Sequence, residues 1–209
     1  QWHPGMLSRF CHPILSPDPV LREDDALRFL QELGHAIGGR SVLLPTTDAF
    51  VTFVANHRSE LQDTYEFNVS DVVHSLTDKG QQYRLAAGLG IPTPRTAFPG
   101  EQDVEEIAAD MEYPCILKPC QSHLWLRFVG THSTKSWGKA IEVHSGSELV
   151  QTYREVSRSG LPFMVQETIP GRDDQLYGLF TYLDRTSQPL AVLTKRKLRQ
   201  SPRGYGVGS

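Results

Sequence analysis

The sequence predicts a mixed α/β and α+β protein, in which an α/β unit is followed by an antiparallel sheet with helices. Up to about residue 75, helix-type segments alternate with a short apolar strand, which is typical of a parallel sheet covered by helices. From about 110 to 170, short apolar strands accompany a helix with a capping motif. Two further strand-type segments, 176–184 and 190–198, flank five polar residues and predict an antiparallel hairpin.

The composition is that of an ordinary globular protein. Hydrophobic residues make up 39% of the 209 residues and charged residues 22%, which excludes a wholly disordered or coiled-coil chain. A net charge of −3 argues against a nucleic-acid partner, and three cysteines without CxxC spacing argue against a disulfide scaffold or a zinc ribbon. The apolar runs are far shorter than the ~18 residues that cross a membrane, and no signal peptide is visible, so we expect a cytoplasmic protein.

The first predicted unit contains two helices around one strand. Segment 23–37 places its leucines on one helical face, and two glycines follow and end the helix. Residues 41–45 form a short apolar run and predict a buried strand. Residues 46–48 then offer an N-cap for a helix that continues to Leu61.

After residue 77 each predicted element follows from its own cap, chain breaker or apolar periodicity. These elements are a helix opened by Asp78-Lys79 and closed by Gly90, a strand over 96–98, a helix over 103–111, strands over 114–119, 139–143 and 163–167, a helix that starts at the capping box Ser145-x-x-Glu148, and the hairpin. Residues 120–138 are polar and irregular in pattern, so they predict a loop.

Lys118 stands near the end of the otherwise apolar strand 114–119. An unpaired buried ammonium is costly, so this lysine needs a partner. A salt bridge to a nearby carboxylate would make it a structural residue, whereas a phosphate contact would make it a functional one. The residues alone favour neither alternative.

Lys79 directly follows the predicted N-cap Asp78. Helix N-termini disfavour cations and favour anions, so a lysine here could share a bound anion with the N–H groups of the helix. A solvated surface lysine is the simpler interpretation, and Lys79 taken alone is a weak signal.

Lys195, Lys197 and Arg199 alternate along the last predicted strand, so we expect them to share one face. Three neighbouring cations repel one another unless something negative lies between them. One interpretation is a solvated basic face, and the other is a site for a polyphosphate or an acyl phosphate.

The segment from Gln166 to Asp174 leaves a strand and passes through a turn at 169–171. Main chain exposed at such a strand end can offer N–H and C=O groups to a purine, and an aspartate a few residues later can accept from ribose hydroxyls. A plain exit from a strand with an acidic, solvated tip is equally compatible with the spacing.

The histidines and cysteines predict neither a metal site nor a disulfide. The spacing of His123, His132 and His144 matches no known metal cage, so we predict no metal ligand among them. Cys115 and Cys120 flank Lys118 and are expected to be buried or nearly buried thiols, and a disulfide between them is not expected in a cytosolic protein.

Four motifs in order cover about residues 40–209 and are specific as a set. They are Asp78-Lys79, LAAGLGIPTPRT (85–96), YPCILKP (113–119) and MVQETIPG (164–171). Together they resemble the ATP-grasp superfamily of carboxylate–amine ligases, in the branch similar to the large subunit of carbamoyl-phosphate synthase and to D-aspartate ligase.

The resemblance implies a role for each matching residue. Seven residues are the candidates for binding ATP: Lys79 and Lys118 at the α- and β-phosphates, Gln166, Glu167 and Ile169 at the adenine, and either Asp173 or Asp174 at the ribose. Two catalytic cations of the large lobe would face the phosphoryl or acyl-phosphate group: Lys197 and Arg199.

The implied reaction has two steps. A carboxylate oxygen attacks the γ-phosphate of ATP to give an acyl phosphate, and an amine or ammonia then displaces phosphate and forms an amide. The implied partners are ATP, Mg²⁺, a small carboxylate and an amine. The oligomeric state is not predicted.

The sequence departs from the family pattern in two places. The stretch 121–138, normally rich in glycine, has only Gly130 and Gly138. The magnesium ligands of the family, a Glu and then a Glu–x–Asn near the end of the large lobe, have no counterpart, so we expect them outside this chain. We therefore expect the chain alone to be inactive. The alternative is a nucleotide-binding or partner-binding module without catalysis.

The resemblance also implies three domains. Residues 1–77 would be a Rossmann-like pre-ATP-grasp α/β domain that lacks its first strand. Residues 78–170 would be the linker helices and small lobe of the ATP-grasp fold, and 171–209 the truncated beginning of its large lobe. The chain opens at Gln1 rather than Met and closes on a glycine-rich stretch, so we expect it to be part of a longer protein.

Overall fold

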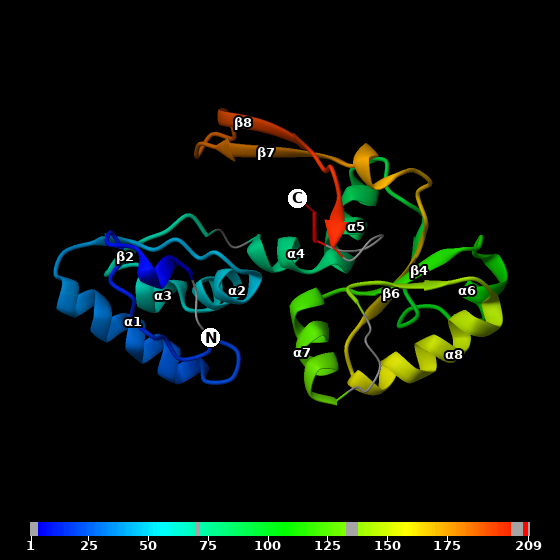
Figure 1. Ribbon diagram of the computed structural model, residues 1–209, viewed down its shortest axis with the longest axis horizontal. Coiled ribbons are helices and arrows are strands. Elements are labelled where there is room, and N and C mark those ends of the chain that lie inside the picture. The colour runs from blue at the N-terminus through cyan, green and yellow to red at the C-terminus, as the bar shows by residue number, and fades with distance from the viewer. Residues whose placement is uncertain (1–3, 70–71, 133–137, 202–206, 209) are drawn as a thin grey trace. The chain divides into compact units, whose positions relative to one another are not determined.

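The computed structural model describes residues 4–69, 72–132, 138–201 and 207–208. The chain forms two compact units, Gln1–Thr77 and Asp78–Ser209, called the first and the second unit below. Figure 1 shows the helices and strands of each unit. The predicted mixture of helices and strands is confirmed, with a parallel strand pair in the first unit and antiparallel pairs in the second. None of the described helices has both the length and the apolar character to cross a membrane.

The first unit is built from helices and one small parallel sheet. Ser41 lies opposite Tyr65, and Val42 lies opposite Glu66. The elements of this unit are η1 (Pro4–Leu7), α1 (Glu23–Ile37), β1 (Ser41–Val42), α2 (Asp48–Asn56), α3 (Arg58–Leu61), β2 (Tyr65–Glu66) and α4 (Val73–Thr77).

The helix boundaries of this unit follow the predicted caps. Helix α1 has the predicted bounds and ends at Gly38, whose φ of 72° favours glycine. The hydroxyl of Thr47 caps α2 by accepting from the N–H of Phe50 at 3.4 Å. The predicted helix to Leu61 is interrupted at His57, so α2 and α3 are separate.

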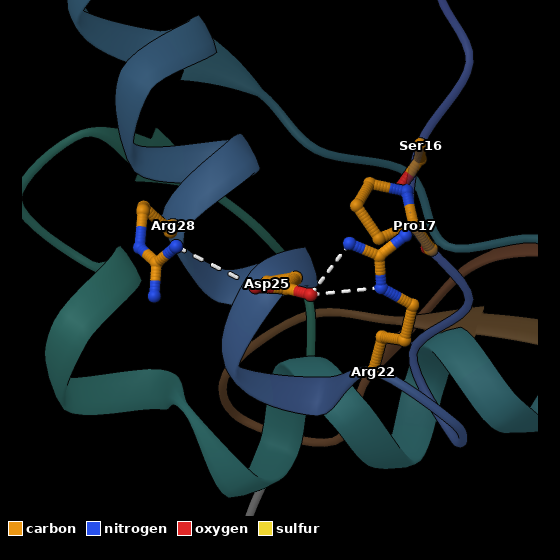
Figure 2. A network of polar contacts seen from close by, with 5 residues as sticks. All are labelled: Ser16, Pro17, Arg22, Asp25 and Arg28. Atoms are coloured by element: carbon orange, nitrogen blue, oxygen red, sulfur yellow. Dashed lines mark hydrogen bonds and ion pairs between the residues drawn. The ribbon is translucent and has the colours of Figure 1, made fainter.

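The first turn of α1 carries charges on its surface. Figure 2 shows Asp25 between Arg22 and Arg28, with ion pairs of 2.7 and 3.5 Å. Just before the helix, the hydroxyl of Ser16 donates to the carbonyl of Pro17 at 3.0 Å. Exposed pairs of this kind contribute only about 0.2–0.5 kcal/mol each. Helix α1 is therefore held mainly by its buried face.

That buried face packs on a core shared by α1, α2, α3 and β2. Tyr65 joins α1 to β2, because its hydroxyl donates to the carbonyl of Leu30 at 2.7 Å. Gly34 permits this approach, since a Cβ there would collide with Thr64 and press on the ring of Tyr65. The buried members of the core are Ala26, Leu30, Phe53, Val54, Leu61, Tyr65, Val69 and Val73.

The prediction that residues 41–45 form a buried strand is wrong. Val42 is 69% exposed and Leu44 is 75% exposed, whereas Leu43 packs against the core. Among the described residues, β1 pairs only with β2, so alternate side chains of this run have no covering layer. An apolar run does not by itself distinguish a strand buried on both faces from a strand buried on one.

The second unit is centred on a four-stranded antiparallel sheet in the order β3-β6-β4-β5. The expectation of an antiparallel sheet with helices is therefore confirmed. The elements of this unit are α5 (Lys79–Gly88), β3 (Thr96–Ala97), α6 (Val104–Asp110), β4 (Cys115–Pro119), α7 (Ser122–His132), β5 (Ile141–Val143), α8 (Gly146–Val156), η2 (Ser157–Ser159), β6 (Phe163–Glu167), η3 (Asp173–Gln175), β7 (Tyr177–Leu183), β8 (Pro189–Arg196), β9 (Gln200–Ser201) and β10 (Val207–Gly208).

The two faces of this sheet differ in chemistry. Helices α6 and α8 contact each other and pack on one face, where Cys115, Leu117 and Val165 are fully buried (Figure 1). Because side chains alternate along a strand, Lys118 on β4 and Gln166 on β6 point to the opposite face. Lys118 and Gln166 thus lie on the face opposite the apolar core, together with the fully buried Met164.

The prediction of a loop over 120–138 is wrong for its first half. Residues 122–132 form helix α7, and 133–137 lie outside the described residues. Trp125 is fully buried and packs against Phe128 and Phe163, with ring centroids 5.9 and 5.1 Å away. The spacing of Trp125, Phe128 and Val129 is that of a helical face, which the neighbouring serines, threonines and histidines obscure.

The predicted hairpin is confirmed. Strands β7 and β8 pair antiparallel, with Tyr177 opposite Arg196 and Gly178 opposite Lys195. The side chains of both faces are exposed, as Leu179 at 67% and Leu193 at 65% show. Strand β8 ends at Arg196, so Lys195 lies within it and Lys197 and Arg199 lie beyond its end. The expectation that these three cations alternate along one strand is therefore wrong.

Candidate functional site

Lys118 lies at the centre of a polar network on the face of the sheet opposite the apolar core. Its ammonium donates to the side-chain oxygen of Gln166 at 2.5 Å and to the hydroxyl of Tyr83 at 3.3 Å. The ammonium also lies 5.0 Å from the centre of the Tyr83 ring. The amide nitrogen of Gln166 donates in turn to the hydroxyl of Thr96 at 2.8 Å. These four residues are called the Lys118 network below.

The partners of Lys118 are neutral. Among the described residues no carboxylate pairs with this ammonium, which favours the phosphate-contact alternative over the salt bridge. An amide oxygen and a phenol can orient an ammonium without cancelling its charge. The network therefore presents a half-buried positive charge, which suits an anionic ligand.

Sequence reasoning missed two members of this network. Tyr83 lies four residues after Lys79 in helix α5, so the two share a helix face, and this spacing is a signal that could have found it. Thr96 lies opposite Gln166 in the β3–β6 pair. That pairing depends on a strand register that a single sequence does not specify.

Lys79 lies at the first position of α5, as predicted, and Asp78 caps this helix by accepting from the N–H of Gln81 at 3.0 Å. The main-chain N–H of Lys79 donates to the carbonyl of Cys120 at 2.9 Å, and its ammonium donates to the hydroxyl of Ser122 at 3.0 Å. Both contacts lie just beyond the end of β4. The structure thus brings Lys79 and Lys118 to the same end of one strand.

Glu167 and Ile169 follow Gln166 at the end of β6. The main-chain N–H of Glu167 donates to the carbonyl of Arg95 at 3.0 Å, and its carboxylate accepts from the N–H of Arg95 at 2.8 Å. Ile169 is 61% exposed in the turn after the strand. The strand end therefore holds Glu167 by two hydrogen bonds, and Ile169 in the following turn is exposed.

The two candidate ribose residues lie in η3. Asp174 forms ion pairs with Arg196 at 3.2 Å and Arg172 at 3.4 Å, and its carbonyl accepts from Arg196 at 2.6 Å. The side chain of Asp173 lies outside the described part of the structure. Asp174 thus ties η3 to the last residue of β8.

Lys197 and Arg199 lie after β8, between this strand and β9. The main-chain N–H of Lys197 donates to the carbonyl of Leu176 at 2.8 Å, which extends the pairing of the hairpin by one bond. Arg199 is exposed. The ammonium of Lys195, within β8, lies 4.6 Å from the centre of the Phe180 ring and makes a cation–π contact with it.

The cysteines next to Lys118 are buried thiols, as expected. Cys115 and Cys120 are 0% and 3% exposed and form no disulfide. Burial, above all, raises the pKa of each thiol to about 11, and the nearby charges of Glu148 and Asp78 add to the effect at Cys115 and Cys120 respectively. Neutral thiols of this kind are poor nucleophiles.

We expect only one fast-reacting thiol at pH 8 in the folded chain. Cys11 is exposed, whereas Cys115 and Cys120 are protonated and covered. Titration with a chromogenic disulfide reagent should therefore give one equivalent at once and the other two only in denaturant. Because both pKa values are raised, the stability that the neutral thiols provide is lost as pH rises from the ordinary thiol pKa towards about 11.

The Cys11→Ser variant is the matched control, since it should remove the fast phase entirely. A second fast equivalent in the folded wild-type chain would contradict the burial of the two thiols.

In sequence and in fold, the chain is similar to known ligases and synthetases. No family model matches the chain. The chain is 23% identical over 207 residues to a D-aspartate ligase of Enterococcus faecium, and the match covers 94% of this chain and 48% of that protein. The chain therefore spans about half the length of this curated relative.

Solved structures show the same likeness. An N5-carboxyaminoimidazole ribonucleotide synthetase in complex with ADP matches with a TM-score of 0.60 at 12% identity, over 88% of this chain and 43% of that one. A carboxyaminoimidazole ribonucleotide synthase from Aspergillus clavatus complexed with ATP matches with a TM-score of 0.53 at 11% identity, over 84% of this chain and 41% of that one. The resemblance to ATP-grasp ligases that the four motifs predict is confirmed at the level of the fold, because the chain is similar in fold to part of these two structures.

Proposed function

We propose that the chain is the ATP-binding part of an ATP-dependent carbon–nitrogen ligase, which activates a carboxylate as an acyl phosphate and joins it to an amine or ammonia. The observation that carries the proposal is Lys118, a half-buried ammonium that is held by neutral groups and has no carboxylate partner among the described residues. The ligase and synthetase names of the relatives, and the ADP and ATP in two of their structures, support it.

In this proposal the two lysines bind the α- and β-phosphates. Their placement at one end of β4 supports a joint role, because Lys118 is the second-last residue of this strand and Lys79 contacts Cys120 and Ser122 just beyond it. The N–H groups of the first turn of α5 add partial positive charge beside Lys79. Each charge-assisted hydrogen bond to a phosphate would contribute ~1.5–3 kcal/mol.

The adenine and ribose contacts are also part of the proposal. The main chain of Glu167 and Ile169, with Gln166 beside them, would bind the adenine. The ribose would donate to Asp173 or Asp174. Asp174 could accept such a bond while it stays paired with Arg196, because a carboxylate offers about four acceptor positions.

The catalytic step would depend on cations that stabilise charge on the transferring phosphoryl group. Lys197 and Arg199 are proposed for this role. The family also implies Mg²⁺, but the described residues contain no group of three acidic, histidine or cysteine side chains that could hold a metal ion. We therefore derive no step through the metal, and we propose that this chain alone does not complete the reaction.

The units of the structure suggest how these roles are divided. We propose that the first unit corresponds to the pre-ATP-grasp domain. Residues 78–170 would be the small lobe, and the hairpin that follows would begin the large lobe. The sheet and helices of the small lobe would contribute the Lys118 network, while η3 and the segment after the hairpin would contribute the ribose and catalytic residues.

Calorimetric titration of the chain with ADP, ATP and AMP in the presence of Mg²⁺ tests this proposal. ADP and ATP should bind, and AMP should bind at least about tenfold more weakly, because it lacks the β-phosphate and hence one charge-assisted bond. Equal affinities for ADP and AMP, or no binding of either, would contradict the assignment of the lysines. Release of phosphate from ATP by this chain alone would contradict the proposed lack of turnover.

A further inference from the structure

The side chain of Thr96 uses its only hydrogen-bond donor locally. Its hydroxyl donates to the carbonyl of Pro94 at 2.8 Å. The hydroxyl oxygen can therefore only accept a second hydrogen bond from its remaining neighbour. That neighbour is the side-chain amide of Gln166, at 2.8 Å.

This arrangement fixes the direction in which the amide points. Only the NH₂ group of Gln166 can donate to the Thr96 oxygen, so the amide oxygen must face the other way. At that other end lies the ammonium of Lys118, which can only donate. The constraints at the two ends agree, and together they define one orientation of the amide.

The surroundings keep the amide in that orientation. Gln166 is only 4% exposed, so water cannot readily replace either partner. Thr96 and Gln166 lie directly opposite each other in the β3–β6 pair, which places their side chains on the same face of the sheet. The hydroxyl of Tyr83 also donates to the amide oxygen, at 3.4 Å.

We propose that Thr96 is a positioning residue for Lys118 and acts through Gln166. The chain of hydrogen bonds runs from Lys118 to Gln166, then to Thr96, and ends at the carbonyl of Pro94. It directs a neutral acceptor at the ammonium, so Lys118 is held in place and keeps its full charge for an anion. The proposal rests on the proposed function, in which Lys118 binds a phosphate of ATP.

Thr96→Val tests the proposal, because it removes the hydroxyl and keeps the shape of the side chain. Without the acceptor, the amide of Gln166 loses its fixed direction and Lys118 loses a fixed partner. We expect the affinity for ADP to fall roughly three- to tenfold, the factor that corresponds to one lost neutral hydrogen bond. Thr96→Ser should restore the affinity to within about twofold of the wild type, because it restores the hydroxyl.

Thr93→Val is the matched control. Thr93 lies three residues earlier, and its hydroxyl makes no hydrogen bond with the described residues. This variant should leave the affinity for ADP unchanged. An equal loss in Thr96→Val and Thr96→Ser, or no loss in either, would overturn the role of the Thr96 hydroxyl.

A second readout does not depend on the nucleotide. In ¹H–¹⁵N spectra of the chain labelled at its glutamine side chains, the Gln166 amide should give two well-separated proton signals that exchange slowly with water. In Thr96→Val these signals should move together and exchange faster, whereas Thr96→Ser should resemble the wild type. An unchanged Gln166 amide in Thr96→Val would overturn the positioning role, while failure of the wild type to bind ADP would overturn only the proposed function.

Discussion

Replacing Lys118 with methionine is expected to weaken ADP binding by roughly ten- to hundredfold, which corresponds to the loss of one charge-assisted hydrogen bond to a phosphate. Methionine is unbranched and replaces most of the apolar stem of the lysine without its charge. The amide oxygen of Gln166 keeps the Tyr83 hydroxyl as a donor, so the fold should survive. Calorimetric titration with ADP measures the effect directly, and thermal unfolding without nucleotide checks the fold.

Lys139→Met is the matched control for charge. Lys139 is an exposed lysine just before β5, and the substitution removes the same charge from the same unit. It should leave ADP binding within about twofold of the wild type, since exposed charges contribute little. If Lys118→Met and Lys139→Met bind ADP as tightly as the wild type, Lys118 does not contact the nucleotide.

Replacing Trp125 with alanine should destabilise the second unit by about 3–5 kcal/mol, the usual cost of removing a buried tryptophan. Trp125 is fully buried, lies against Phe128 and Phe163, and donates from its ring nitrogen to the carbonyl of Gly138 at 3.0 Å. Removing it leaves a cavity between α7 and the sheet. Urea denaturation followed by circular dichroism measures the change in the free energy of unfolding.

Two further substitutions make this test specific. Trp125→Phe keeps most of the packing and loses the ring nitrogen, so it should cost clearly less than the alanine variant. Leu126→Ala removes a neighbouring side chain of α7 that is 40% exposed, so its effect should be small. A cost below about 1 kcal/mol for Trp125→Ala would show that α7 is not packed on the core as described.

The parts of the fold that the sequence predicts well are those with local signals. Asp78, Ser145 and Asp103 cap the helices that follow them, because each needs only its own side chain and the next turn. The hairpin likewise follows from two strand-type segments and a short polar connection. The four motifs of the family resemblance are local in the same sense.

The parts that the sequence does not predict depend on distant partners. Val42 looked buried because it is apolar, yet no described strand or helix covers it. The segment 120–138, expected to be a loop, contains a helix because Trp125 packs among buried side chains of the sheet and of α8. The composition of the segment itself carries no information about these distant packing partners.

The candidate site shows the same division. Lys118 and Gln166 can be identified as candidates from the sequence, but their hydrogen bond to each other cannot be predicted from it. Their contact depends on the antiparallel register of β4 and β6, and the role of Thr96 depends on the register of β3 and β6. The choice between a salt bridge and a neutral network at Lys118 could be made only once these registers were known.

The measurement that most directly tests a phosphate site at the two lysines is labelling with an acyl-phosphate derivative of ATP, whose acyl group is transferred to a lysine amine close to the bound phosphates. Peptide mass spectrometry would then identify the modified residues. We predict labelling of Lys118 and Lys79 that excess ATP suppresses, and labelling of exposed lysines such as Lys139 that excess ATP does not change. Absence of ATP-sensitive labelling at both Lys118 and Lys79 would contradict the proposed nucleotide site.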